Sequence, residues 1–102
     1  MLFFLRFESH RPANMPNKEW QEVLAAENEF GIEAAAEGKL KGAYLAAGTH
    51  LMLAILDLDS IEEMHTFVRS APLFPYSESI VYPVVDMGKK HRRDAEARLG
   101  NG

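Results

Sequence analysis

Two segments of this chain are apolar on both faces of a predicted β-strand, and no other feature constrains its fold more. Side chains of a strand alternate between two sides. In residues 2–8 one side carries Leu2, Phe4 and Arg6, and the other carries Phe3, Leu5 and Phe7. Residues 50–56 are almost continuously hydrophobic. Because both faces of such strands must be shielded from water, the chain requires a sheet that is covered on both sides.

A long helix is predicted after the first strand. Asn17 is the expected N-cap of a helix over residues 18–36, with the acidic Glu19 in its first turn. Gly38 is expected to end this helix, because glycine readily adopts the conformation that closes a helix.

A shorter helix is predicted after the loop Asp57 to Ser60. Ser60 is the expected N-cap, and Glu63, three residues later, completes a capping box. Pro72 ends this helix, because the residue before a proline avoids the helical conformation. The chain then enters a last strand that begins at Tyr76.

The elements follow the order strand, helix, strand, strand, helix, strand. The four strands are expected over residues 2–8, 40–47, 50–56 and 76–85. This βαββαβ order is typical of an α+β, ferredoxin-like antiparallel sheet with both helices on one face. Two helices cover only one face, so we expect the other face to pack against the sheet of a second copy. The chain is therefore predicted to form at least a homodimer.

Length and charge limit the number of domains and the partners. The 102 residues form one domain, with residues 1–87 folded and residues 88–102 as a polar, solvated and partly helical tail. A net charge of −4 argues against nucleic acid as the main partner, since phosphate binding requires a basic face. The apolar residues 1–5 are too short to span a membrane and lack the features of a signal peptide. A cytoplasmic protein without membrane association is expected.

The residue types narrow the chemistry. The chain has no cysteine and its four histidines are scattered, so no metal site is expected. No glycine-rich phosphate loop follows a strand, and no nucleophile elbow is present. If the protein is an enzyme, what remains is acid–base chemistry on an organic ligand, without a cofactor.

Glu27 is the candidate for such chemistry. It lies at the centre of the apolar stripe of the long helix, which consists of Trp20, Val23, Leu24, Phe30 and Ala34. Burial disfavours an ionised carboxyl group, raises its pKa and suits it to act as a general base or acid near neutral pH. The alternative is a boundary glutamate whose carboxyl group reaches solvent or pairs with a lysine.

Further polar side chains on otherwise apolar elements are candidates for substrate binding. They are Arg6, Tyr44, His50, His65 and Tyr76. His65 is expected on the apolar stripe of the second helix, with Ile61, Met64 and Val68. Three of the five also have a structural interpretation: a surface ion pair for Arg6, support of the following turn for His65, and core packing for Tyr76.

The most distinctive motif is the segment 64–76, with the sequence Met-His-Thr-Phe-Val-Arg-Ser-Ala-Pro-Leu-Phe-Pro-Tyr. A helical turn runs into two prolines that bracket Leu-Phe, and an aromatic residue opens a strand. This junction resembles the hallmark helix-to-strand junction of the muconolactone isomerase family. Other segments lie where that family has them: Met1-Leu2-Phe3, the Pro12 to Met15 turn, Glu27-Asn28-Glu29, the Glu37-Gly38 helix end and the Asp57 to Ser60 turn. The resemblance covers residues 1–87.

The resemblance implies a dimeric α+β barrel that can assemble further into decamers. It also implies a cofactor-independent isomerase of aromatic-compound catabolism, which moves a ring double bond of an unsaturated lactone by proton transfer. Glu27 coincides with an acidic position that is a candidate proton shuttle in the family, and His65 belongs to the family's helix motif. The implied ligand is a small apolar or lactone-type organic compound.

Several positions depart from the family pattern. Phe4 stands where members carry a histidine near the start of the first strand, and Leu45 stands where they carry an arginine on the second. Residues 51–53, Leu-Met-Leu, replace polar residues on the third strand. A buried carboxylate without its partner is costly, so we expect a substrate that is larger and less charged than muconolactone.

Two other classes of function remain open at this point. The same scaffold serves as a non-catalytic small-molecule-binding protein or a cofactor-free tailoring protein, and an apolar lining suits either role. A purely structural oligomerisation domain would explain strands that are apolar on both faces, but it would not explain Glu27.

Overall fold

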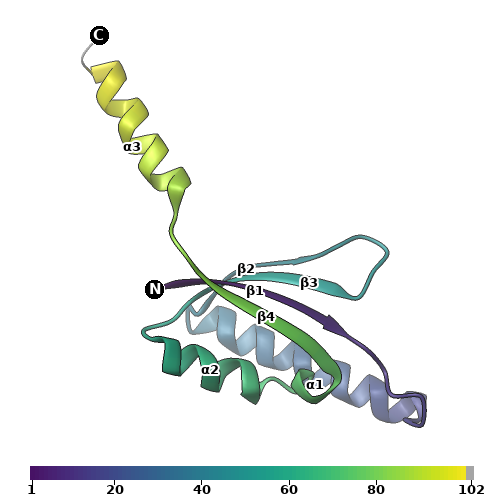
Figure 1. Cartoon of the computed structure of the whole chain (residues 1–102). Coiled ribbons are helices and arrows are strands. Elements are labelled where there is room, and N and C mark those ends of the chain that lie inside the picture. Colours follow the sequence, from purple (N-terminus) through teal and green to yellow (C-terminus); the bar gives the residue numbers. More distant parts are fainter. Residues whose placement is uncertain (101–102) are drawn as a thin grey trace.

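The computed structural model describes residues 1–100 and contains one four-stranded antiparallel sheet with two helices packed on one face (Figure 1). The strands are β1 (Leu2–Ser9), β2 (Leu40–Leu45), β3 (Leu51–Asp57) and β4 (Ser77–Val84), in the order β2-β3-β1-β4. The helices are α1 (Asn17–Ala36), α2 (Ile61–Ser70) and α3 (Met87–Gly100), and a 3-10 turn covers Phe74–Tyr76. The predicted α+β fold with βαββαβ order is confirmed, and α3 follows it.

The core lies between the sheet and α2. Phe3 of β1 and Leu56 of β3 are almost completely buried and lie opposite each other in the antiparallel register. The core cluster consists of Phe3, Leu5, Ala54, Leu56, Leu58 and Met64. Burying a side chain such as Phe3 stabilises the fold by roughly 1.5–3 kcal/mol. The side chains of β1 that face the core thus belong to the side of the strand that carries Phe3, Leu5 and Phe7, as the alternation of the sequence predicted.

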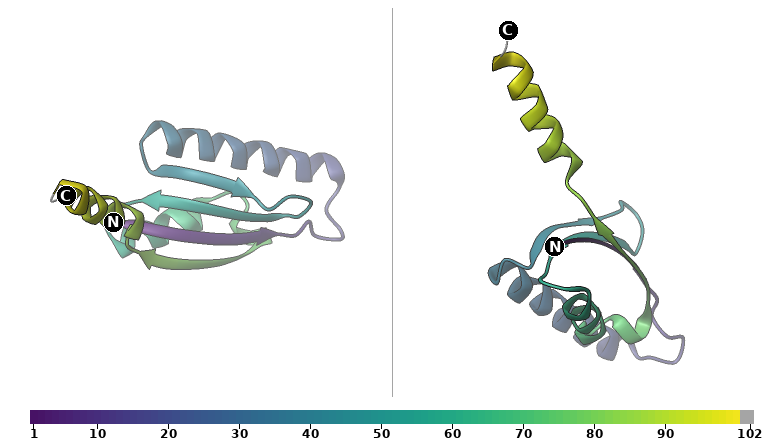
Figure 2. Two further views of the ribbon diagram at one scale, coloured as in Figure 1. Left: turned by 90° about the horizontal axis from the view of Figure 1, so that it is seen from above. Right: turned by 60° about the vertical axis from the view of Figure 1, so that its left-hand side comes forward.

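The outer face of the sheet is open and carries several exposed apolar side chains, with the charged Arg6 among them. Both helices lie on the opposite side, as the right-hand view of Figure 2 shows. Tyr44 of β2 and Ile80 and Tyr82 of β4 are exposed on the outer face. Phe4 packs against Tyr82, with their ring centroids 6.5 Å apart. This open face is the surface for which the sequence predicts a partner.

The start of α1 differs from the prediction. The helix begins at Asn17, its N-cap position is Pro16, and no side chain caps it, so the expected Asn17 cap is wrong. The carbonyl oxygen of Pro16 accepts the N–H of Trp20 at 3.1 Å, so the helix starts one residue earlier than expected and Asn17 already lies inside it. The Arg11 guanidinium group donates to the carbonyl oxygen of Met15 at 2.9 Å and holds the turn before the helix.

The end of α1 follows the prediction. Gly38 has a φ of +78°, in the left-handed region that favours glycine, and its N–H donates to the carbonyl oxygen of Ala35 at 3.1 Å. The N–H of Lys39 reaches back to Ala34 at 2.9 Å. These bonds close the helix and turn the chain into β2.

The cap of α2 is confirmed. The Ser60 hydroxyl accepts a hydrogen bond from the N–H of Glu63 at 3.0 Å. The Glu63 carboxylate accepts from the N–H of Asp59 at 3.0 Å instead of from Ser60, so the box closes one residue earlier than expected. Both bonds satisfy backbone donors near the start of the helix.

The helix α3 stands apart from the remainder of the chain (Figures 1 and 2), and none of its residues is buried. The radius of gyration is 17.1 Å, whereas about 13 Å is typical of a compact chain of 100 residues. Asp86 accepts a hydrogen bond from the N–H of Lys89 at 2.8 Å and caps the helix. Within residues 1–100, no helix combines the length and apolar character that crossing a membrane requires.

Candidate functional site

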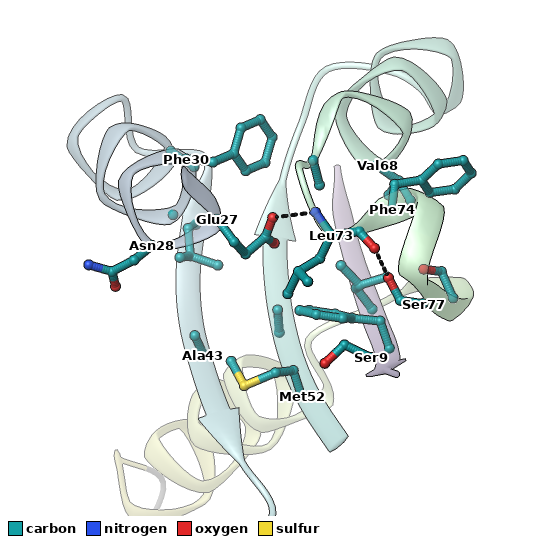
Figure 3. Close-up of a pocket in the computed structure, with 18 of the residues that line it drawn as sticks. Ser9, Glu27, Asn28, Phe30, Ala43, Met52, Val68, Leu73, Phe74 and Ser77 are labelled. Atoms are coloured by element: carbon teal, nitrogen blue, oxygen red, sulfur yellow. Dashed lines mark hydrogen bonds between the residues drawn. The ribbon is translucent and has the colours of Figure 1, made fainter. Parts of the chain in front are cut away.

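A cavity of about 530 Å³ lies between the inner face of the sheet and the helices (Figure 3). Most of its lining is apolar and comes from all four strands, from α1 and α2, and from the junction that follows α2. The polar residues that line it are Ser9, Glu27, Asn28, Thr49, His50, Ser77 and Ser79. Among the described residues, no lysine or arginine lines this cavity, and Glu27 is its sole carboxyl group.

Glu27 points from α1 into the cavity, toward the junction after α2 (Figure 3). Its Oε2 accepts a hydrogen bond from the backbone N–H of Leu73 at 3.1 Å. Burial raises the pKa of Glu27 above its ordinary value near 4.5, and the bond from Leu73 opposes that rise in part. A carboxyl group whose pKa is raised by burial is a stronger base than an exposed one and can accept and return a proton.

The junction makes the N–H of Leu73 available to Glu27. Ala71 adopts an extended conformation before Pro72, with φ −66° and ψ 132°, which ends α2. Leu73 itself is buried, and its carbonyl oxygen accepts the N–H of Tyr76 at 2.9 Å. Because the helix has ended, the N–H of Leu73 lies outside its hydrogen-bond ladder and is free to bind a side chain.

Ser77 holds the same junction from β4. Its hydroxyl donates to the carbonyl oxygen of Leu73. Figure 3 shows Leu73 bound on both sides, by Glu27 at its N–H and by Ser77 at its carbonyl oxygen. The motif that marks this sequence thus positions the acidic side chain of the cavity.

Of the predicted site residues, Glu27 and His50 line the cavity. Tyr76 packs edge-on against Trp20, with ring centroids 6.0 Å apart, and does not line it. Arg6 and Tyr44 point to the outer face of the sheet, where both are exposed and flank Leu53 in neighbouring strands. The fold therefore does not bring these three side chains to Glu27.

His65 does not lie on the buried stripe of α2, so the expectation that it does is wrong. Its side chain is exposed, whereas the neighbouring Met64 is buried and Phe67 and Val68 are partly buried against the core. Ile61, which was expected on the same stripe, is also exposed. The buried side of α2 is therefore narrower than expected and consists of Met64, Phe67 and Val68.

The departures from the family pattern fall on both faces of the sheet. Leu45 and Met52 line the cavity and make it more apolar than the family pattern implies. Leu51 and Leu53 alternate with Met52 and therefore point to the outer face. Phe4 also lies there, against Tyr82. Of these departures, only Leu45 and Met52 therefore change the polarity of the cavity.

Further polar residues line the cavity that no sequence motif had indicated: Ser9, Asn28, Thr49, Ser77 and Ser79. The signal for Ser9 was present, because the period of two places it on the same face as Phe3 and Phe7. Ser77 and Ser79 follow the same rule on β4. Single serines on strands match no sequence motif, so their common role is recognised only when the structure shows that they line one cavity.

The fold and this cavity define a class of protein: a small α+β domain with one partly buried carboxyl group in an apolar ligand pocket. The family model described as muconolactone delta-isomerase matches residues 1–90. The chain belongs to the muconolactone delta-isomerase family.

Named relatives and solved structures agree with this assignment. The muconolactone delta-isomerase of Acinetobacter baylyi is 32% identical over 76 residues, which cover 74% of this chain and 79% of that protein. That of Cupriavidus pinatubonensis is 31% identical over 84 residues, or 82% and 91%. A crystal structure of muconolactone isomerase matches with a TM-score of 0.79 at 26% identity, over 84% of this chain and 90% of that one.

A more distant structure shares the fold alone. It is 5-chloro-2-hydroxyhydroquinone dehydrochlorinase from Burkholderia phenoliruptrix, which matches with a TM-score of 0.58 at 22% identity, over 81% of this chain and 93% of that one.

Proposed function

We propose that this protein is a cofactor-independent isomerase that moves a carbon–carbon double bond in a small unsaturated lactone or related carbonyl compound. One observation carries the proposal: the sole carboxyl group of the cavity, Glu27, lies among apolar side chains, and burial raises its pKa. Relatives that bear the name muconolactone delta-isomerase support the same class of reaction.

The reaction needs one side chain that accepts a proton and gives it back. The Glu27 carboxylate removes a proton from a ring carbon next to the conjugated system, and the electron pair of that C–H bond moves toward the carbonyl oxygen to form an enolate. The protonated Glu27 then returns the proton to the other end of the conjugated system. The double bond has moved, no atom has been gained or lost, and Glu27 is again a carboxylate.

The substrate is proposed to be larger and less charged than muconolactone. A bound carboxylate would find no lysine or arginine in the lining and would meet the negative charge of Glu27. Leu45 and Met52 add apolar surface. The volume of about 530 Å³ lies within the range of roughly 300–1,000 Å³ that is typical of pockets for larger organic ligands.

The functional unit is proposed to be at least a homodimer that pairs its outer sheet faces. Tyr44 and Tyr82 lie on the two edge strands of that face and are 65% and 51% exposed, and Ile80, on the same strand as Tyr82, is 42% exposed. Large apolar side chains exposed together on one face mark an interaction site. A second copy supplies the same surface, so two sheets can cover each other around a two-fold axis.

The test is turnover of two lactones followed by ultraviolet absorbance. One is muconolactone, and the other is the neutral butenolide that carries a methyl group in place of the carboxymethyl group. The pair tests the charge of the substrate and not its size, because the methyl compound is smaller than muconolactone. We expect the neutral lactone to give the higher kcat/KM. In the Glu27→Gln variant, we expect kcat to fall by about 10²- to 10⁴-fold, with folding verified by circular dichroism.

Two results would contradict the proposal. Binding of the neutral lactone without turnover, unchanged by Glu27→Gln, would identify a small-molecule-binding protein. Faster turnover of muconolactone than of the neutral lactone would reject the less charged substrate while leaving the reaction class in place.

A further inference from the structure

Three serines bring hydroxyl groups to one end of the apolar cavity. Ser9 ends β1, Ser77 begins β4, and these two are paired across the strands. Ser79 is paired with Phe7, one step further along the same face. All three serines line the cavity, so the inner face of the sheet is apolar at one end and hydroxylated at the other.

Ser9 differs from the other two. It is 8% exposed, and among the described residues it is the only polar residue that is buried. Its hydroxyl takes part in none of the hydrogen bonds formed between residues 1 and 100, whereas the Ser77 hydroxyl is committed to the carbonyl oxygen of Leu73. Within residues 1–100, every side-chain oxygen or nitrogen that is fully enclosed has a hydrogen-bond partner. Because the Ser9 hydroxyl has no partner, its oxygen is not fully enclosed and faces the cavity.

Figure 3 shows the Ser9 hydroxyl and the Glu27 carboxylate on different sides of the same cavity, with Leu73 and Met52 around the space between them. An ionised carboxylate can only accept hydrogen bonds, so Glu27 cannot bind the carbonyl oxygen of a ligand. Ser9 can, because a hydroxyl group donates one hydrogen bond. A free hydroxyl in an apolar pocket also costs energy until a ligand satisfies it.

We propose that Ser9 is a further substrate-contacting residue, whose hydroxyl donates a hydrogen bond to the carbonyl oxygen of a neutral unsaturated lactone or enone. This inference rests on the proposed function. As Glu27 removes the ring proton, negative charge grows on that carbonyl oxygen, and the bond from Ser9 strengthens. Ser9 therefore stabilises the enolate without a change in its own protonation state.

This arrangement also determines how the substrate is oriented in the cavity. The carbonyl oxygen lies toward the β1–β4 end of the cavity, and the acidic C–H bond faces α1. The neutral carbonyl needs one donor and no cation, which fits a lining without lysine or arginine. The cavity thus selects compounds that carry one hydrogen-bond acceptor on an otherwise apolar ring.

The test compares Ser9→Ala with Ser79→Ala and Ser9→Thr on the neutral methyl butenolide. Loss of a donor to a developing enolate lowers kcat by about 10²-fold, and we expect this for Ser9→Ala, with KM changed far less and the Glu27-dependent limb of the pH profile unmoved. Ser9→Thr keeps a hydroxyl and should recover most of kcat. Ser79→Ala removes a cavity hydroxyl of the same type and should lower kcat far less than Ser9→Ala does.

Binding of the saturated methyl lactone, followed by NMR line shifts, provides a readout without turnover. We expect weaker binding by Ser9→Ala than by the parent. Equal kcat in Ser9→Ala and the parent would reject the role of Ser9 and leave the isomerase intact. Equal losses in Ser9→Ala and Ser79→Ala would reject a specific donor. A folded parent that neither binds nor converts these lactones would overturn both this inference and the proposed function.

Discussion

Glu27 is subject to two opposing influences in the folded protein. Removal from water disfavours its charged form, and the N–H of Leu73 favours it. Burial is the larger effect, so the pKa is raised. A carboxyl group whose pKa is higher in the folded state than in the unfolded state binds its proton more tightly on folding, and this links acid–base function to stability.

The stability of the protein should therefore depend on pH through Glu27. The contribution of this group is fully present below the unfolded pKa near 4.5 and is lost as the pH rises through the folded pKa. Because Glu27→Gln removes the buried charge and keeps an oxygen that can accept from Leu73, the variant should be more stable than the parent at neutral pH. The difference should shrink toward zero below about pH 4.

Urea unfolding of both proteins between about pH 4 and pH 8 measures this difference directly. Glu19→Gln is a matched control, since Glu19 is exposed on the same helix, and its difference from the parent should stay small at each pH. An advantage of Glu27→Gln that is the same at every pH would contradict the linkage.

At the scale of elements, the junction between α2 and β4 connects the most distinctive sequence motif to the site. Pro72 places Ala71 in an extended conformation, the 3-10 turn Phe74–Tyr76 follows, and the N–H of Leu73 is left for Glu27. Pro72 thus has a consequence beyond the shape of the chain, because it ends α2 and leaves the N–H of Leu73 free for the hydrogen bond that opposes the rise in the pKa of Glu27.

Replacing Pro72 by alanine should loosen this junction. The substitution gives the unfolded chain more freedom, which costs about 0.4–1 kcal/mol, and it permits the backbone to continue as a helix. A weaker bond from Leu73 then raises the pKa of Glu27 further. Thermal unfolding and NMR titration of the Glu27 carboxyl carbon measure the two effects.

Pro75→Ala is the matched control. Pro75 lies in the exposed part of the same junction, in the 3-10 turn, so its loss should lower stability by a similar amount and leave the pKa of Glu27 unchanged. Equal shifts of that pKa in both variants would show that the junction acts only as a whole.

At the scale of the whole molecule, the chain folds with one side of its sheet covered and the other bare. The radius of gyration of 17.1 Å reflects a domain from which α3 projects, and the outer face of the sheet presents tyrosine, isoleucine and phenylalanine side chains. A monomer of this form leaves apolar surface in water that a second copy can bury.

A negative charge in place of Tyr82, beside Phe4 on the outer face, should prevent this pairing. The parent should elute as at least a dimer of its 11.5 kDa chain, and Tyr82→Glu should be a monomer, because an unpaired charge in an apolar interface is costly. Ile61→Glu is the control, since Ile61 is 59% exposed on α2, on the other side of the sheet. Size-exclusion chromatography with light scattering distinguishes them, and a monomeric parent at micromolar concentration would contradict the expectation.

Much of this architecture could be predicted from local patterns. Period-two alternation in residues 2–8, Ser60 as a cap, and Gly38 and Pro72 as helix ends each act over a few neighbouring residues, so they can be recognised without a structure. The central place of Glu27 on the stripe of α1 has the same origin. These features determine the order of the elements and the helix that carries the acid.

The composition of the site was decided by tertiary structure. Ser9 and Ser77 share one end of the cavity because β1 and β4 pair in one register, and a shift of one residue would turn both hydroxyls to the outer face. His65 is exposed because α2 packs on the core through Met64, Phe67 and Val68 instead. By itself, the sequence determined the elements, the bare sheet face and the acid. Only packing between distant segments decided which polar groups face that acid, because side-chain periodicity is local and a cavity is not.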